Sequence, residues 1–166
     1  MKYATLLLFV VIAATSCKKK TDTVSNRTTS LTCDYIPATS IGIIGGKYTQ
    51  ETTNAGESIL LEFSRSSTIL NSYDAGIGST LFFTVNAGVT SFSYDAAELQ
   101  RRLTYYEQYE GWGGSTQFPI TKGTISGYKD GDKWQVTINV ELPVPDNITK
   151  VNTINVSSPF THVQIL

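Results

Sequence analysis

Residues 133–142 read KWQVTINVEL, and in this stretch apolar and polar side chains alternate without a break. The apolar members are Trp134, Val136, Ile138, Val140 and Leu142. Because successive side chains of a β-strand point to opposite faces, this period of two predicts a strand with one face in the core and one in water. Asp130-Gly131, just before it, favours a two-residue turn, so we expect a hairpin with the preceding residues, GTISGYK.

Similar short runs of strand-forming residues recur between turn signals along the rest of the chain. We expect further strands at 41–44, 58–64, 80–85, 89–94, 152–156 and 162–166. Nine Tyr, seven Phe and thirteen Gly, with only 16% charged residues, also favour strands and turns over helices. The sequence therefore predicts one all-β domain over residues 33–166, built as a two-sheet antiparallel β-sandwich of about eight strands.

One segment, DAAELQRRLTYY at residues 95–106, carries a helix signal. Asp95 and Glu98 have the spacing of a capping box, and Leu99 and Leu103 lie among apolar residues at helical spacing. We expect one short helix here. A strand over part of this segment stays open as the alternative, because its aromatic end also fits an alternating pattern.

The N-terminus has the layout of a secretory signal peptide over residues 1–16. Lys2 precedes an apolar run from Leu6 to Ala14, and small residues follow it up to Cys17. A bilayer span needs about 20 apolar residues, so this run is too short to be a membrane anchor.

The segment ATSC, Ala14 to Cys17, resembles the lipobox of bacterial lipoproteins, although Ala14 stands where leucine is usual. The resemblance implies that Cys17 receives a diacylglyceryl group and becomes the acylated first residue of the mature chain, with palmitate-type chains as its membrane anchor. Lys18 is not the aspartate of an inner-membrane retention signal, so the resemblance implies the outer membrane of the cell envelope. Which leaflet holds the protein stays open.

Charge is distributed unevenly between the predicted tether and the predicted domain. Residues 17–32 are polar and include Lys18, Lys19 and Lys20, which suits a flexible tether beside anionic lipid headgroups. Residues 31–166 hold 8 basic and 13 acidic side chains, a net charge of −5, which argues against nucleic-acid binding, because that needs a basic face on the domain itself. With Cys17 acylated, Cys33 would be the only thiol left, so we expect a buried thiol and no intramolecular disulfide.

The segment YYEQYEGWGG, residues 105–114, is the candidate ligand-binding segment. Tyr105, Tyr106, Tyr109 and Trp112 lie beside two carboxylates and three glycines, as a sugar-stacking surface requires. The alternative is that these rings cap one end of the core, because aromatic side chains usually pack inside.

The sequence offers little for catalysis or metal binding. His162 is the only histidine, and one histidine with one thiol cannot supply a usual zinc site, so we expect neither a metal nor a cofactor. We therefore expect a non-enzymatic envelope lipoprotein with a structural or ligand-binding role, its partner a glycan or an envelope protein. The alternative is a carboxylate-dependent hydrolase acting on envelope or extracellular glycans.

Overall fold

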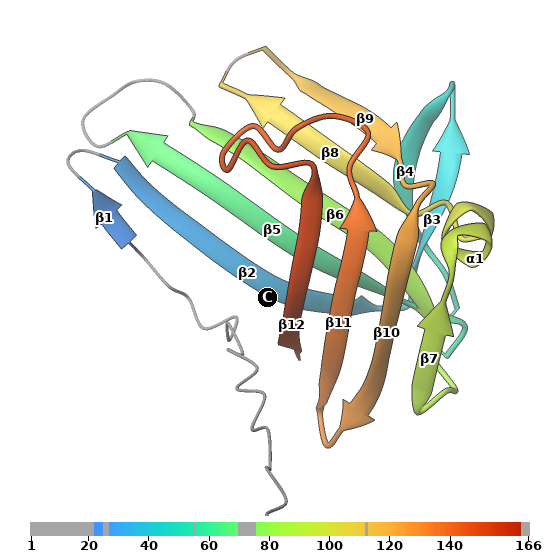
Figure 1. The fold of residues 1–166 in the computed structure, drawn as a ribbon. Helices are drawn as coiled ribbons and strands as arrows, with labels where there is room; N and C mark the ends of the chain where they lie inside the picture. Colours follow the sequence, from blue (N-terminus) through green and yellow to red (C-terminus); the bar gives the residue numbers. More distant parts are fainter. Residues whose placement is uncertain (1–21, 25–26, 55, 70–75, 112, 164–166) are drawn as a thin grey trace, which may run out of the picture.

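The computed structural model describes residues 22–24, 27–54, 56–69, 76–111 and 113–163, and Figure 1 shows the chain as a ribbon. Strands dominate this part of the chain, and one short helix accompanies them. In chain order the elements are β1 (Asp22–Val24), β2 (Arg27–Pro37), β3 (Thr39–Ile44), β4 (Lys47–Thr52), β5 (Ser58–Ile69), β6 (Ile77–Asn86), β7 (Ser91–Tyr94), α1 (Ala96–Arg101), β8 (Tyr105–Glu110), β9 (Ser115–Pro119), β10 (Gly123–Asp130), β11 (Lys133–Glu141) and β12 (Thr153–His162).

Ten of the strands form one sheet in the order β7-β10-β11-β12-β2-β5-β6-β8-β9, with β1 paired to β2. Nearly all neighbours are antiparallel. The exception is β12 beside β2, which is parallel and only two residue pairs long, Thr161 with Asp34 and His162 with Tyr35. Figure 1 shows that the four strands β7, β10, β11 and β12 cross in front of the other half at a steep angle. The sheet therefore folds back on itself at this junction.

The prediction of an all-β fold with one short helix is confirmed, whereas the two separate antiparallel sheets are not found. The structure has one continuous sheet, with a parallel junction between its halves. The halves still pack face to face, because one apolar core takes buried side chains from both. Phe63, Leu81 and Phe83 come from one half, and Ile138 and Phe160 from the other. The alternation of apolar and polar residues predicts correctly which side chains enter this core, but it does not predict how the two halves of the sheet are joined.

The hairpin predicted around Asp130-Gly131 is confirmed. β10 pairs with β11 from Asp130–Lys133 to Gly123–Val140, and Gly131 takes the positive φ of 63° that such a turn needs. Every apolar residue of the alternating stretch in β11 and just after it is at most 3% exposed. The period of two therefore identifies the core face of β11 correctly.

The N-terminal part of the domain differs from the prediction at two points. β2 begins at Arg27, so a paired strand already occupies residues that the sequence predicts as tether. Cys33 is buried in the core as expected, but it is disulfide-bonded, so the expectation of a lone thiol is wrong. The chain contains one other cysteine, Cys17, which lies outside the described residues, as does the signal-peptide segment.

The helix signal at residues 95–106 is confirmed in its first half. α1 covers Ala96–Arg101, and the Asp95 carboxylate accepts the backbone N–H of Glu98 at 2.9 Å. This contact satisfies one N–H group that the first helical turn leaves without a partner. Leu99 fixes the helix to the domain, since its side chain is fully buried in the core. The aromatic second half belongs to β8, as the strand alternative proposed.

A second, smaller sheet covers the outer face of the five-stranded half. It is the hairpin of β3 and β4, and with the strands below it forms an apolar cluster of Ile41, Leu60, Phe82 and Tyr105. The side-chain amide of Gln117 on β9 ties the hairpin down, because it accepts the backbone N–H of Tyr48 and donates to the Tyr48 carbonyl. The same face of the other half carries no such cover in the described part of the chain.

Trp134 provides the test of the core. Its indole is 1% exposed and lies against Phe92, with ring centroids 5.6 Å apart. We expect Trp134→Ala to lower the free energy of unfolding by about 3–5 kcal/mol, through lost burial and the cavity that remains. Chemical denaturation measures this, with Thr137→Ala on the exposed face of β11 as the control. Equal stability of Trp134→Ala and wild type would contradict the core assignment.

Candidate functional site

The structure places the four aromatic residues of the predicted ligand-binding segment in different environments. Tyr105 and Tyr106 are 2% and 1% exposed, so neither ring is accessible for stacking on a ligand. Tyr109 is half-buried, and its ring lies over Gly78 on the adjacent strand β6. Trp112 lies outside the described residues. For Tyr105, Tyr106 and Tyr109, the structure supports the alternative that these rings pack within the fold.

Tyr105 and Tyr106 are buried on opposite sides of the sheet because they are neighbours in one strand. Tyr105 lies between Phe82 and Tyr48, with ring centroids 4.7 Å apart on both sides, under the β3–β4 hairpin. Burial, together with the nearby carboxylates of Glu107 and Glu62, raises its pKa well above the usual range. Tyr105 therefore works as a neutral packing residue.

Tyr106 points into the core and is part of a buried polar network around Asp146. Its hydroxyl and that of Ser79 each donate to Oδ2 of Asp146 at 2.7 Å. The backbone N–H groups of Ile148 and Thr149 donate to Oδ1 at 2.9 and 2.6 Å. Burial alone would raise the pKa of Asp146, but these hydrogen bonds outweigh it and lower the pKa to about 2. The same burial raises the pKa of Tyr106 to about 12.

The network has a structural role because it connects two regions that are distant in sequence. Asp146 follows β11, whereas Ser79 and Tyr106 belong to the five-stranded half of the sheet. Asn147 adds to the connection, since its side-chain amide donates to the carbonyls of Gly78 and Tyr109 at 3.0 Å. The segment between β11 and β12 is thereby held against β6 and β8.

We expect Asp146→Asn to lower the free energy of unfolding at pH 7 by about 2–4 kcal/mol, because the amide leaves buried donors without acceptors. The pKa of Asp146 is lowered on folding, so its contribution is complete above about pH 4 and is lost as pH falls through about 2. Denaturant unfolding between pH 2 and pH 7 should show a flatter acid limb for the variant than for wild type. The exposed Glu141→Gln is the matched control, and an unchanged acid limb in Asp146→Asn would contradict this role.

A pair of carboxylates lies on the outer face of the five-stranded half. Asp34 on β2 is directly opposite Glu62 on β5, and the amide of Gln50 donates to Glu62 at 3.2 Å. Burial raises the pKa of both carboxyl groups, and the negative charge of Asp34 raises that of Glu62 further. This pair could not be predicted from the sequence, because the sequence does not reveal which strands are neighbours.

His162 and the remaining acidic residues form no metal centre in the described residues, where no group of three or more possible ligands is found. The imidazole of His162 is exposed and packs against the aromatic ring of Tyr35, with ring centroids 5.3 Å apart.

The outer face of the four-stranded half contains an open hollow of about 380 Å³. Its lining residues are Ser91, Phe92, Ser126, Gly127, Tyr128, Gln135, Thr137 and Ser157. None of these side chains is charged. Tyr128 is 58% exposed, and its neighbours across the strands are Ser91 on β7 and Gln135 on β11. An exposed aromatic ring is thus surrounded by hydroxyl and amide groups on a rigid sheet.

The polar groups beside Tyr128 are available to a ligand. In the described part of the chain, Thr137 and Ser157 share a hydrogen bond of 3.0 Å, but Ser126, Tyr128 and Gln135 use their side chains in none. The alternation at residues 133–142 places Gln135 and Thr137 on the water-facing side of their strand. Continuing the alternation through the hairpin would have placed Tyr128 on the same face.

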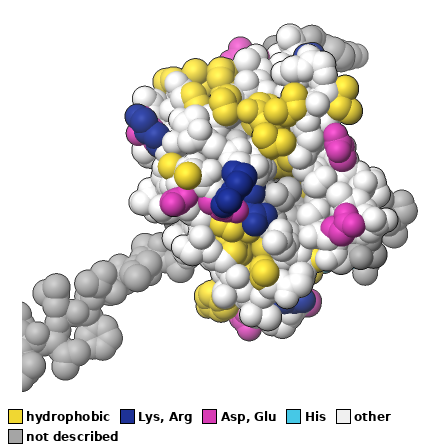
Figure 2. Space-filling view, turned by 90° about the vertical axis from the view of Figure 1, so that its right-hand side faces the viewer, with side chains coloured by type: hydrophobic (Ala, Val, Ile, Leu, Met, Phe, Trp, Pro, Cys, Tyr) yellow, Lys and Arg dark blue, Asp and Glu magenta, His cyan; other side chains and the backbone are white. Residues whose placement is uncertain are grey.

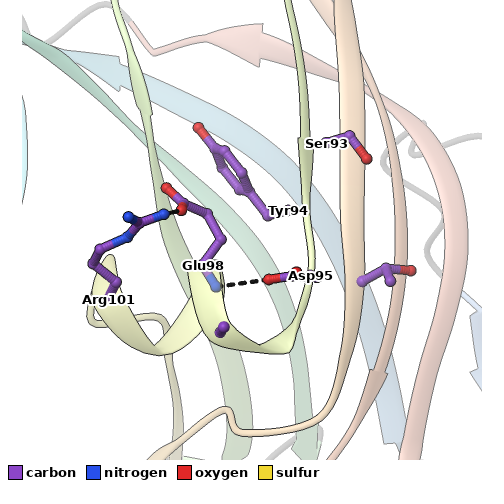
Figure 3. A pocket seen from close by; sticks show the side chains of 7 residues that line it. Ser93, Tyr94, Asp95, Glu98 and Arg101 are labelled. Carbon is purple, nitrogen blue, oxygen red and sulfur yellow. Dashed lines mark hydrogen bonds and ion pairs between the residues drawn. The ribbon is translucent and has the colours of Figure 1, made fainter.

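A second hollow, of about 670 Å³, lies between α1, the end of β7 and the start of β10 (Figure 3). It contains Asp95, Glu98 and Arg101, together with Ser93, Tyr94, Ala97 and Thr124. The charged groups here are engaged with the protein itself: Asp95 caps α1, and Glu98 forms ion pairs with Arg101 and with Arg102. This hollow is therefore explained by the anchoring of α1.

No family model, no curated protein and no solved structure matches this chain. Within the described residues, no helix is both long enough and apolar enough to cross a membrane. The hollow beside Tyr128 is consequently assessed from its own chemistry.

Proposed function

We propose that the protein is a lipid-anchored envelope lipoprotein that binds a neutral glycan chain on the outer face of β7, β10, β11 and β12. The observation that carries the binding role is the exposed ring of Tyr128 beside the uncharged polar hollow. No enzymatic step is part of this proposal.

The chemistry of the hollow suits a sugar. The flat face of an aromatic ring packs against the C–H groups of a pyranose, and hydroxyl and amide groups form hydrogen bonds with its hydroxyls. Ser91, Ser126 and Gln135 surround Tyr128 with such groups. The absence of charged side chains from this lining favours a neutral ligand over an anionic one. Because the site is on paired strands, little ordering is required when the ligand binds.

The anchoring role rests on the sequence around Cys17. Its lipobox-like segment and the three lysines after it support an acylated N-terminus at an anionic lipid surface. Each buried CH₂ group contributes about 0.8 kcal/mol, so two or three acyl chains hold a protein stably on a membrane. The disulfide at Cys33 weighs against acylation, because Cys17 is the one other cysteine of the sequence and a sulfur that carries an acylglyceryl thioether cannot also form a disulfide.

A glycan hydrolase is the second candidate function, supported by the pair of Asp34 and Glu62. A carboxyl group whose pKa is raised can act as a general acid beside a second carboxylate. Two features weigh against this role. Neither hollow described above reaches the pair, and the Gln50 amide already binds Glu62.

The Tyr128 site is tested with Tyr128→Ala. We expect the affinity for the glycan found in an array screen to fall at least about tenfold, with the melting temperature unchanged, because the ring is exposed. Calorimetric titration measures the affinity. Tyr128→Phe keeps the stacking face and should retain most of the binding, and Val151→Ala changes an exposed apolar residue outside the hollow. Full affinity in Tyr128→Ala would refute the site.

The anchor is tested with Cys17→Ser. We expect wild type to incorporate labelled palmitate and to fractionate with the outer membrane, and the variant to lose both properties, because the acyl chains supply the anchor. Mass spectrometry of the mature N-terminal peptide checks the acyl group directly. A disulfide-linked peptide pair containing Cys17 and Cys33 in the mature wild-type protein would contradict acylation.

A further inference from the structure

The tip of the β3–β4 hairpin exposes two adjacent isoleucines. Ile43 and Ile44 are 52% and 64% exposed, and they are two of only four large apolar side chains that are exposed in the described part of the chain. Gly45 and Gly46 follow with φ angles of 59° and 79°, so the turn is tight and the isoleucines stand at its end.

The pattern of exposure shows that the tip projects beyond the sheet below it. Adjacent residues of a strand point to opposite faces, so burial of one face would hide either Ile43 or Ile44. Both are exposed, whereas Ile41, on the same face as Ile43, is only 9% exposed. The hairpin is therefore packed on the sheet at Ile41 and free of it two residues later. Figure 2 shows apolar side chains gathered in a band across the upper part of the face that carries this hairpin.

Charge around the tip fits a lipid surface. Lys47 pairs with Ile44 and is the one charged residue between Ile43 and Tyr48. The nearest acidic residue along the hairpin, Glu51, extends its carboxylate over Gly42, on the body side of the isoleucines. In a bilayer the acyl region accepts apolar side chains, and the anionic headgroups outside it attract a lysine. The order of Ile43, Ile44 and Lys47 from the tip toward the body matches these two regions.

We infer that residues 43–47 insert into the headgroup and upper acyl region of an anionic bilayer, as a second membrane contact beside the lipid anchor. In Figure 1 the hairpin tip lies at the upper right of the molecule, and β1, the described element nearest to Cys17 in sequence, lies at the left. The role as a second contact rests on the proposed acylation of Cys17. Insertion of the tip does not, because its side chains belong to the folded domain.

The test measures vesicle binding of the mature chain, residues 17–166, carrying Cys17→Ser, so that neither an acyl chain nor the apolar signal segment contributes. Vesicles of phosphatidylglycerol and phosphatidylethanolamine are compared with phosphatidylcholine alone. We expect partitioning into the anionic vesicles, reduced about fivefold to tenfold by Ile44→Ser and more by Ile43→Ser with Ile44→Ser. Lys47→Ser should lower binding only to anionic vesicles, about fivefold. Val151→Ser, elsewhere on the surface, is the matched control.

A direct readout of depth uses Ile44→Trp. Its added fluorescence, relative to the parent chain, should shift to the blue with vesicles and be quenched by lipids brominated near the headgroup. Binding that Ile43→Ser with Ile44→Ser leaves unchanged would overturn the inference, as would the absence of both binding and quenching. Concentration-dependent self-association that the same double variant abolishes would also overturn it and assign the tip to a second copy of the chain. If wild type does not incorporate labelled palmitate, this result refutes the proposed acylation of Cys17 and leaves the insertion of the hairpin tip standing.

Discussion

The apolar core shared by the two halves of the sheet is the feature on which the rest of the structure depends. The hydrogen-bonded connection between the halves is only two residue pairs long, so backbone pairing alone cannot hold them face to face. Side chains from β5 and β6 meet those from β11 and β12 across a core in which most residues are almost inaccessible to water. Burial of this apolar surface supplies the main free energy that keeps the halves together. Asp146 adds a second, polar connection through Ser79 and Tyr106.

Local patterns in the sequence predicted the local structure well. The alternation around Trp134 identified the core face of β11, Asp130-Gly131 identified its turn, and Asp95 identified the start of α1. Each of these features depends on neighbours within a few residues, and the backbone responds to them directly. The joining of the halves through β12 and β2 depends on pairing between residues more than a hundred positions apart, which no local period encodes.

The aromatic segment shows how a correct observation led to an incomplete prediction. Tyr105 and Tyr106 are adjacent in a strand, so at least one of them would be solvent-exposed if only one face of the sheet were covered. Both are buried because the β3–β4 hairpin covers the outer face at that point, and Gln117 fixes it there. The hairpin arises from residues 39–52, whose position over β8 is a tertiary feature. Tyr128, in contrast, could have been found by extending the alternation of β11 across its turn into β10.

Coverage of the sheet also explains why the proposed binding face is where it is. The outer face of the five-stranded half has apolar residues and is closed by a hairpin that stacks Tyr48 on Tyr105. The outer face of the four-stranded half has hydroxyl and amide side chains, which can remain in water without a covering layer. A ligand can therefore reach a sheet surface beside Tyr128 without any movement of the backbone. The same hairpin that closes one face extends past it at Ile43 and Ile44, so one element both completes the fold and creates the apolar projection.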